Sequence, residues 1–520
     1  MFRAFFLSPQ KKPSSLQPIA FKPIITSMEI DLTKSAPQVQ TLEEAQALIN
    51  ALWSVLRKQG KQIEEQARRI EGQARRIEEQ ARRIEELEEK LNTNSRNSSK
   101  PPSTDQGKGK APKPPASSGK KAGGQPGHAG KGRALLAPEH VTHFHDCYPD
   151  KRCDCGGEIR TSRLSWRHQV IDVPEIKPVV TQYCLYAGTC QGCGKQHEAA
   201  LPPGVSPRLA GPRLLALIGT LTGGYRLSKR LVQGLLQDLF QIDVSLGTIS
   251  QSEELLSAAL APIAQEAHEY IKHAPAVHAD ETGHKEKGQK QWMWVAIAGM
   301  VSVFLARAAR SAQVAQELLG DRFAGILISD RYAAYHWVDP LRRQLCWAHL
   351  LRDFTKISER SGVAGQVGED LLAHTHRIFR FWYCVRDGTL SRDGFACHML
   401  FLQAQVEAAL RRGGACGESR TANTCKRILK VKDALWTFVD TPGIEPTNNL
   451  AERTIRSYVI WRKISFGTQS KRGSLYMERM MTAVGSCKLQ GRNILDFLTQ
   501  AVQAHCGNGV PPSLVPAAAG

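Results

Sequence analysis

A heptad repeat over residues 41–92 most constrains the fold, because it commits this whole segment to one long helix. The copies read IEEQARR, IEGQARR and IEEQARR, and then end in IEELEEK. Apolar residues recur at every seventh position, as d residues of a coiled coil, and the matching a positions include Ala67, Ala74 and Ala81. These d residues are Leu42, Ile49, Leu56, Ile63, Ile70, Ile77, Ile84 and Leu91. The repeat predicts a coiled coil, interrupted at Gly60, that joins chains into a homo-oligomer. A solvated single helix is the alternative.

The segments on either side of the repeat predict little regular structure. Residues 1–40 are expected to be a disordered N-terminus, in which Met28 is an alternative start, and residues 506–520 a short tail. Residues 93–134 are rich in Pro, Gly, Ser and Lys and predict a disordered basic linker. The opening MFRAFFLSPQKK has too short an apolar core for a secretory signal.

Charge and cysteine usage indicate the kind of partner and the compartment. The formal net charge is +20, which favours a polyanionic partner, most often nucleic acid. The thirteen cysteines without a secretion signal indicate a reducing compartment, hence a cytoplasmic protein associated with the nucleoid. No run of about 18 apolar residues is present, so we expect no membrane partner.

Residues 135–200 contain two cysteine pairs with the spacing of zinc knuckles. The pairs occur in RCDCGGE and TCQGCGKQ, about 35 residues apart, and suit a tetrahedral Zn²⁺ site in a zinc-ribbon-like domain. The predicted ligands are Cys153, Cys155, Cys190 and Cys193. The first pair is narrow, so Cys147 or a nearby histidine is an alternative ligand. Reduced structural cysteines are the other interpretation.

Residues 201–272 are predicted to be helical. RLSKRLVQGLLQDLF is amphipathic, and DVSLGTISQSEELL follows it with Ser245 or Thr248 as a helix cap. Two helices joined by a short turn favour a helix-turn-helix-like DNA-binding region. Ordinary helix packing explains the same pattern equally well.

Residues 273–505 change to a mixed α/β pattern. APAVHAD, QWMWVAIAG and VSVFLARA predict three strands, SAQVAQELLGD a helix, and AGILISD another strand. This order is typical of an RNase H-like fold. Residues 355–440 are predicted to form a largely helical insertion. The whole chain is therefore a multidomain α/β protein with an RNase H-like catalytic core.

Two of these predicted strands end in an aspartate, Asp280 and Asp330. On adjacent strands these like charges would need a shared cation, and Mg²⁺ (or Mn²⁺) suits oxygen ligands. Glu452 in NNLAERTIR is the candidate third acid, on one helix face with Asn448 and Arg456. A capped or surface carboxylate is the alternative for any one of the three.

Several motifs together resemble one family, the bacterial insertion-sequence transposases of the IS66 family, which use a D-D-E triad. They are NSSKPPS and GGQPGH in the linker, the cysteine pairs, and HADETG, SDRYAAY, CWAHLLRDF and NNLAER further on. The resemblance implies Asp280, Asp330 and Glu452 as catalytic metal ligands. It also implies a C-x-x-H element, Cys346 and His349, that supports the site. The first cysteine pair departs from the family pattern, with Arg152 in place of a cysteine.

The predicted function is metal-dependent DNA cleavage next to the terminal inverted repeats, followed by joining of the 3′-hydroxyl to target DNA. Basic residues just beyond the third acid are predicted to bind the DNA phosphates: Arg453, Arg456, Arg462 and Lys463. Small accessory proteins of the same element are possible partners. The rival functions are a catalytically silent DNA-binding repressor and an RNase H-like nuclease without strand transfer.

Overall fold

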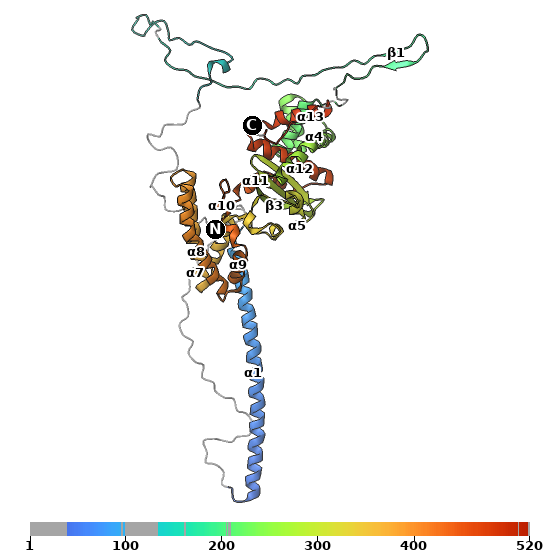
Figure 1. The fold of residues 1–520 in the computed structure, drawn as a ribbon. Coiled ribbons are helices and arrows are strands. Elements are labelled where there is room, and N and C mark those ends of the chain that lie inside the picture. Colours follow the sequence, from blue (N-terminus) through green and yellow to red (C-terminus); the bar gives the residue numbers. More distant parts are fainter. Residues whose placement is uncertain are drawn as a thin grey trace. The chain divides into compact units, whose positions relative to one another are not determined.

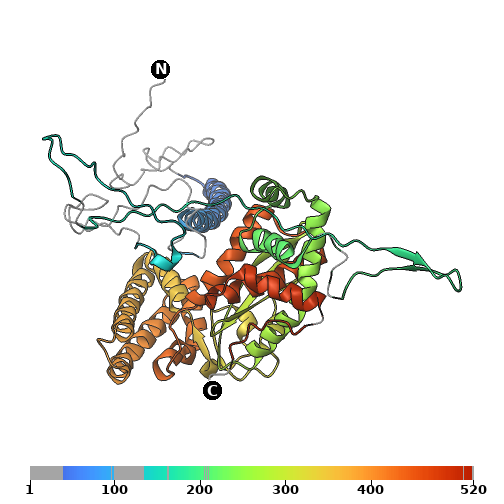
Figure 2. The same cartoon turned by 90° about the horizontal axis from the view of Figure 1, so that it is seen from above.

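The computed structural model describes residues 39–94, 97–98, 134–160, 163–203, 205, 208, 210–507 and 509–517 (Figures 1 and 2). Nearly all of the predicted N-terminal segment and most of the predicted linker lie outside these residues. The chain divides into two compact units, Met1–Asn92 and Thr93–Gly520. Within the described ranges, no helix is long and apolar enough to cross a membrane.

The first unit contains one helix, α1 (Leu42–Asn92), which runs through Gly60 without a break. The helical backbone is therefore continuous at Gly60, and the interruption of the coiled-coil seam there stays a prediction. Alanine, glutamate, glutamine and arginine favour the helix, and the Glu65–Arg69 pair at 2.7 Å adds a contact across one turn. The d residues are exposed, with Ile70 66% and Ile77 65% accessible. A single chain thus leaves this apolar stripe uncovered.

The cysteine region has little regular structure among its described residues. A short 3₁₀ turn, η2 (Pro138–His140), is followed by the antiparallel hairpin of β1 (Ala187–Thr189) and β2 (Gln196–Glu198). Gly194, with φ +73°, forms the left-handed turn between the two strands. The side chains of both strands are exposed.

Three helices precede the sheet: α2 (Pro212–Gly219), α3 (Lys229–Phe240) and α4 (Leu246–Lys272). A π-helical turn, η3 (Thr220–Gly224), extends α2. Ser228 and Ser245 cap α3 and α4, since their hydroxyls accept hydrogen bonds from Leu231 N and Thr248 N.

A five-stranded sheet lies at the centre of the second unit, in the order β5-β4-β3-β6-β7. β3 pairs antiparallel with β4 and β4 with β5, while β6 and β7 run parallel to β3. Helix α5 connects β5 to β6. The bounds are β3 (Ala276–Glu286), β4 (Gln289–Ala298), β5 (Val301–Arg307), α5 (Ala312–Leu319), β6 (Ile326–Ser329) and β7 (Arg343–Leu345).

Helix α12 (Lys471–Leu489) covers the free edge of β5 with hydrogen bonds from its side chains. Glu478, Thr482 and Ser486, spaced one turn apart, accept from the backbone N–H groups of alternate β5 residues at 3.0 Å each. This arrangement satisfies donors that an edge strand otherwise exposes. Gly485 permits the close approach, because an added Cβ would overlap Ser302 Oγ.

A helical region with its own apolar core lies between β7 and the last helices. Phe354, Phe395 and Phe438 are among its fully buried side chains. Its helices are α6 (Trp347–Ser358), α7 (Gly362–Arg386), α8 (Arg392–Ala415), α9 (Ser419–Leu429) and α10 (Thr437–Asp440). Helix α11 (Asn449–Ser465) then returns to the sheet along β3, and α13 (Ile494–Cys506) packs against α2 and α4. The second unit is thus a mixed α/β structure.

Candidate active site

Asp280 and Asp330 occupy matched positions beyond the parallel pairing of β3 with β6. The last register pair is His278 with Ile328, and each aspartate lies two residues further along its own segment. Residues two apart on a strand point to the same face. The pairing therefore places both carboxylates beside the same end of β6.

The sequence predicted that this strand ends at Asp280, but β3 is longer. It continues to Glu286, paired with β4, so that Asp280 lies opposite Val295. Gly283 lies within this strand. The Arg462 guanidinium donates to the Gly283 carbonyl and to Thr282 Oγ1, and a Cβ at Gly283 would lie 3.3 Å from Arg462 Nη1. Because β6 stops where β3 continues, one edge of β3 is open at Asp280.

The electrostatics of Asp280 link all three predicted acids. Burial raises the pKa of Asp280 well above its ordinary value, and the negative charges of Glu281, Asp330 and Glu452 raise it further. A hydrogen bond from Glu281 N–H to Asp280 Oδ1, 2.9 Å long, opposes the shift. The charged side chains that raise this pKa are all acids.

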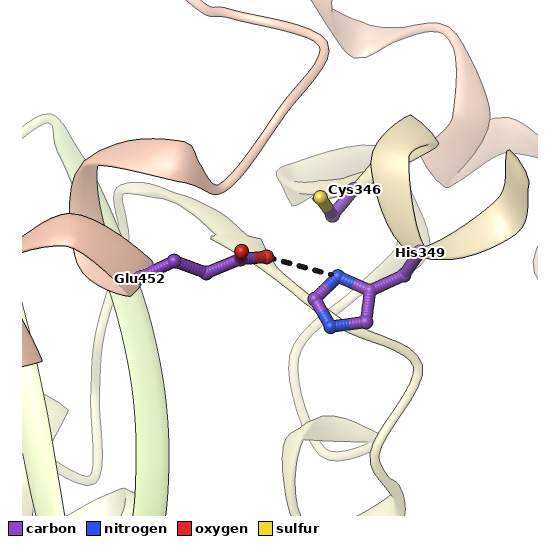
Figure 3. A group of neighbouring side chains, drawn as sticks. All are labelled: Cys346, His349 and Glu452. Atoms are coloured by element: carbon purple, nitrogen blue, oxygen red, sulfur yellow. Dashed lines mark ion pairs between the residues drawn. The ribbon is translucent and has the colours of Figure 1, made fainter. Parts of the chain in front are cut away.

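Glu452 lies in the first turn of α11 and faces the start of α6 (Figure 3). Its Oε1 is 3.4 Å from His349 Nδ1 and 3.8 Å from Arg352 Nη2. Atoms of Cys346, His349 and Glu452 lie within 4.8 Å of one another, and across the described ranges no other such group of three His, Cys, Asp or Glu forms. The three predicted acids are therefore not drawn together to that distance.

Cys346 and His349 are neutral members of this cluster. Burial raises the pKa of Cys346 to about 11, and its Sγ accepts a hydrogen bond from Asn448 N–H at 3.1 Å. Burial and the Arg352 charge lower the pKa of His349. His349 Nδ1 and Glu452 Oε1 are buried without a hydrogen-bond partner. Such unsatisfied atoms are rare and suggest an additional ligand.

The residues at this site fit a divalent cation. Asp280, Asp330 and Glu452 offer hard oxygen donors, which Mg²⁺ and Mn²⁺ prefer. The raised pKa of Asp280 and the unsatisfied Glu452 Oε1 are both features that a cation would relieve. A backbone contact already orients one ligand, because Asp330 Oδ1 accepts from Tyr332 N at 2.8 Å.

Asn448, which was predicted to share a face with Glu452, lies just before α11. It links the start of α11 to β3 and α6. It is 1% exposed, and its Nδ2 donates to Ala279 O at 2.7 Å. Its Oδ1 lies 3.1 Å from His278 Nδ1, and its backbone N–H reaches Cys346. Asn448 therefore fixes the start of α11 against β3 and α6.

The predicted DNA-binding residues differ in their surroundings. Arg453, Arg456 and Lys463 are exposed, and no ion pair or hydrogen bond of their side chains occurs within the described ranges. Arg462 is half-buried and bound to β3. A cavity of about 390 Å³ lies between α7 and the start of α11. Its lining is Phe379, Trp382, Tyr383, Arg386, Glu445, Thr447, Asn449, Glu452, Arg453 and Arg456.

Sequence reasoning missed Glu281, which forms a buried cluster beside Asp280. Its carboxylate accepts from Arg310 Nε at 2.9 Å and from Tyr335 Oη at 2.7 Å. The Arg310 guanidinium also stacks on Tyr332, 3.6 Å from the ring centre. The signals were present in HADETG and SDRYAAY, where the second acid and both tyrosines stand beside the predicted ligands.

The cysteine pairs form two separate turns. Hydrogen bonds from backbone N–H groups lower the pKa of Cys155 in the first turn and of Cys190 in the second, and the partner cysteine lowers each further. In the part of the chain that the structure describes, no three of the four thiols lie within 4.8 Å. The structure thus forms the two knuckles without closing them into one site.

Comparison with known proteins gives two family matches. Residues 208–475 match the family described as Transposase IS66 family, and this range spans Asp280, Asp330 and Glu452. Residues 34–134 match a family of unknown function, DUF6444. An uncharacterized protein of Sinorhizobium fredii, y4qI, is 26% identical over 443 residues, covering 76% of this chain and 78% of the relative. A second from that organism, y4hP, is 22% identical over 386 residues, covering 66% and 68%.

Proposed function

Because this chain belongs to the IS66 family of transposases, we propose that it binds the terminal inverted repeats of its insertion sequence, cleaves DNA there and joins the freed 3′-hydroxyls to target DNA. The observation that carries the proposal is the β3–β6 register, which brings Asp280 and Asp330 to the same end of β6, with the charge of Glu452 also raising the pKa of Asp280. We propose that Asp280 of β3, Asp330 just after β6 and Glu452 of α11 together form the negative site that metal-assisted phosphoryl transfer requires.

The catalytic core is proposed to be RNase H-like, with the helical region between β7 and α11 as an insertion. The sheet order β5-β4-β3-β6-β7, with three antiparallel strands followed by two parallel ones, supports this proposal. The separate apolar core of the helical region supports its treatment as an insertion.

Asp280, Asp330 and Glu452 would hold Mg²⁺ or Mn²⁺. When bound, such ions supply Lewis-acid activation of the attacking oxygen and neutralise charge on the phosphate. Glu281 binds Arg310 and holds its guanidinium beside the acids, so that Glu281, and not Asp280, is the partner of Arg310. His349, neutral and 3.4 Å from Glu452, limits the orientations of that carboxylate.

The DNA is proposed to reach the acids past the cavity between α7 and α11. Arg453 and Arg456 line it beside Glu452 and are free to bind phosphates. Lys463, further along α11, extends this basic face, whereas Arg462 holds β3 in place and contributes charge from there. The helices α3 and α4 are proposed to contribute further DNA contacts in a helix-turn-helix-like manner. The net charge of +20 supports DNA as the substrate.

Assembly and zinc binding complete the proposal. Exposed d residues along α1 support a coiled coil that brings two element ends into one complex. The lowered thiol pKa values of Cys155 and Cys190 support zinc binding by Cys153, Cys155, Cys190 and Cys193, with a role in end recognition. Accessory proteins of the same element and association with the nucleoid are further parts of the proposal.

The same fold is compatible with two other functions. A DNA-binding repressor would bind the ends without cutting them, and a nuclease would cut without joining. The raised pKa of Asp280, to which the charges of Asp330 and Glu452 contribute, supports an enzyme over a repressor. Incubating the protein and Mg²⁺ with duplexes that carry the inverted repeats flanking its gene tests this. We expect site-specific cleavage by the wild type, and binding without cleavage by Asp280→Asn.

A further inference from the structure

Phe466, directly after α11, combines an exposed aromatic ring with an unfavourable backbone conformation. Its side chain is 81% exposed, and its φ of +60° lies in the left-handed region. For a bulky residue without a polar side chain this conformation costs energy. Burial of the ring does not offset the energy of this backbone conformation, because the ring faces solvent. Ile464, two residues earlier, is also 55% exposed.

The segment after Phe466 is held rigidly against the β3–β4 hairpin. Thr468 N donates to Lys285 O and Lys287 N donates to Thr468 O, each at 2.9 Å. Gly467 permits this approach, because a Cβ there would overlap the Lys285 carbonyl. Thr468 Oγ1 also lies 3.2 Å from Nε2 of the fully buried His284. The ring of Phe466 is therefore presented from a fixed position.

The segments next to Phe466 in sequence or through backbone hydrogen bonds carry five lysines. They are Lys285, Lys287 and Lys290 of the hairpin, Lys463 of α11, and Lys471 of α12. All five are exposed, and none forms an ion pair in the described parts of the chain. Lys285 and Lys290 are a register pair across the hairpin. The acid between them in sequence, Glu286, accepts a hydrogen bond from Ser474 at 2.5 Å and is half-buried.

We propose that this surface, Phe466 with its five lysines, grips the element's DNA away from the cleavage point, with the ring wedged against a base step and the lysines on the flanking phosphates. An apolar wedge beside basic side chains is an established way to bind and kink a duplex. A second copy of the chain fits less well, because five uncompensated positive charges repel an identical face. The inference rests on the proposed function, which supplies the DNA.

The helix gives the position of the contact. Phe466 follows Glu452 by fourteen residues, which is about 21 Å at 1.5 Å per residue. For a duplex that runs parallel to α11, at about 3.4 Å per base pair, the wedge would contact DNA on the order of six base pairs from the scissile phosphate.

The test uses the full chain and a terminal-repeat duplex with 2-aminopurine placed in turn at each position from the cut. We expect 2-aminopurine emission to rise at steps near the sixth base pair. Phe466→Asn should abolish the rise and weaken binding by about tenfold, because a wedge contact of this kind contributes roughly that factor. Asparagine accepts the left-handed conformation readily, so this variant removes the ring and spares the backbone. Phe401→Asn, at a residue 60% exposed on α8, is the matched control.

The contribution of the lysines is measured separately, from the salt dependence of DNA binding. Replacing Lys285, Lys463 and Lys471 with glutamine should lower the slope of log affinity against log salt by about 2.7. Unchanged emission at every position in wild-type complexes that still cut would overturn this inference alone. A change in sedimentation of Phe466→Asn with unchanged DNA binding would assign the face to self-association and overturn it as well. A wild type that neither binds nor cuts the repeats would overturn the proposed function instead.

Discussion

Asn448 donates its side-chain amide to the carbonyl oxygen of Ala279 across 2.7 Å, and so joins the start of the helix bearing Glu452 to the strand bearing Asp280. No sequence motif alone specifies this contact, because the two residues are 169 positions apart. This buried amide therefore helps to set the separation between the first and third acids.

Asn448→Ala should lower cleavage by at least about tenfold, because a 1 Å displacement of reacting groups costs that much or more. It removes one hydrogen-bond partner from Ala279 O and one from His278 Nδ1, which costs about 1–3 kcal/mol of stability. Asn493→Ala is the control: Asn493 caps α13 through Leu495 N and Asp496 N, and its loss should cost about 1 kcal/mol without slowing cleavage. Cleavage rates and urea unfolding measure both effects. Equal cleavage by the two variants would refute a positioning role.

Asp280 should make the metal-free protein less stable as the pH rises. Its folded pKa is raised, so the folded state keeps a proton that the unfolded state releases from about pH 4 upward. Asp280→Asn should therefore raise the metal-free melting temperature at pH 7 by roughly 2–4 °C and leave it unchanged at pH 4. Mg²⁺ should stabilise the wild type more than this variant.

Thermal unfolding followed by circular dichroism, from pH 4 to pH 8 with and without Mg²⁺, gives this comparison. Asp238→Asn, at an exposed position of α3, is the control and should match the wild type throughout. An Asp280→Asn protein less stable than the wild type at pH 7 without metal would contradict the account of this carboxylate.

Purified protein should contain about one zinc ion per chain, since four thiolates bind zinc tightly. Cys190→Ser together with Cys193→Ser should remove the ion and weaken end binding, whereas Cys397→Ser, exposed on α8, should not. Elemental analysis measures the zinc content, and a binding titration measures the affinity for the element ends. Less than about a tenth of an equivalent in wild-type protein that still binds its ends would make these cysteines ordinary thiols.

Polar substitution of the α1 stripe should separate the chains. Ile70→Gln with Ile77→Gln removes two d residues that are exposed in the single chain, and dimeric or larger species should become monomers. Arg76→Gln with Arg83→Gln changes the same helix outside the seam and should leave assembly intact. Analytical ultracentrifugation of the full chain distinguishes the cases. A monomeric wild type at high micromolar concentration rules out the coiled coil.

Local patterns predicted the elements around the site well, because strand alternation and helix caps are encoded by neighbouring residues. The β4–β5 hairpin, the strand before Asp330 and the cap Ser245 are confirmed. Long-range contacts were not predictable. The strand was predicted to end at Asp280, but β3 continues past Gly283, where Arg462 binds, and only the folded chain brings these two residues together. The Glu281–Arg310 contact was missed for the same reason.

The central claim is that Asp280, Asp330 and Glu452 form one site that both cuts and joins DNA. A strand-transfer assay tests it most directly: terminal-repeat duplexes with free 3′-hydroxyls, a supercoiled target plasmid, and Mg²⁺. The wild type should join the duplex ends to the plasmid. Asp330→Asn and Glu452→Gln should give no joined product while binding the ends within about twofold, because affinity rests on many phosphate contacts. Joining by either variant at the wild-type rate, or cutting by the wild type without any joining, would contradict the claim.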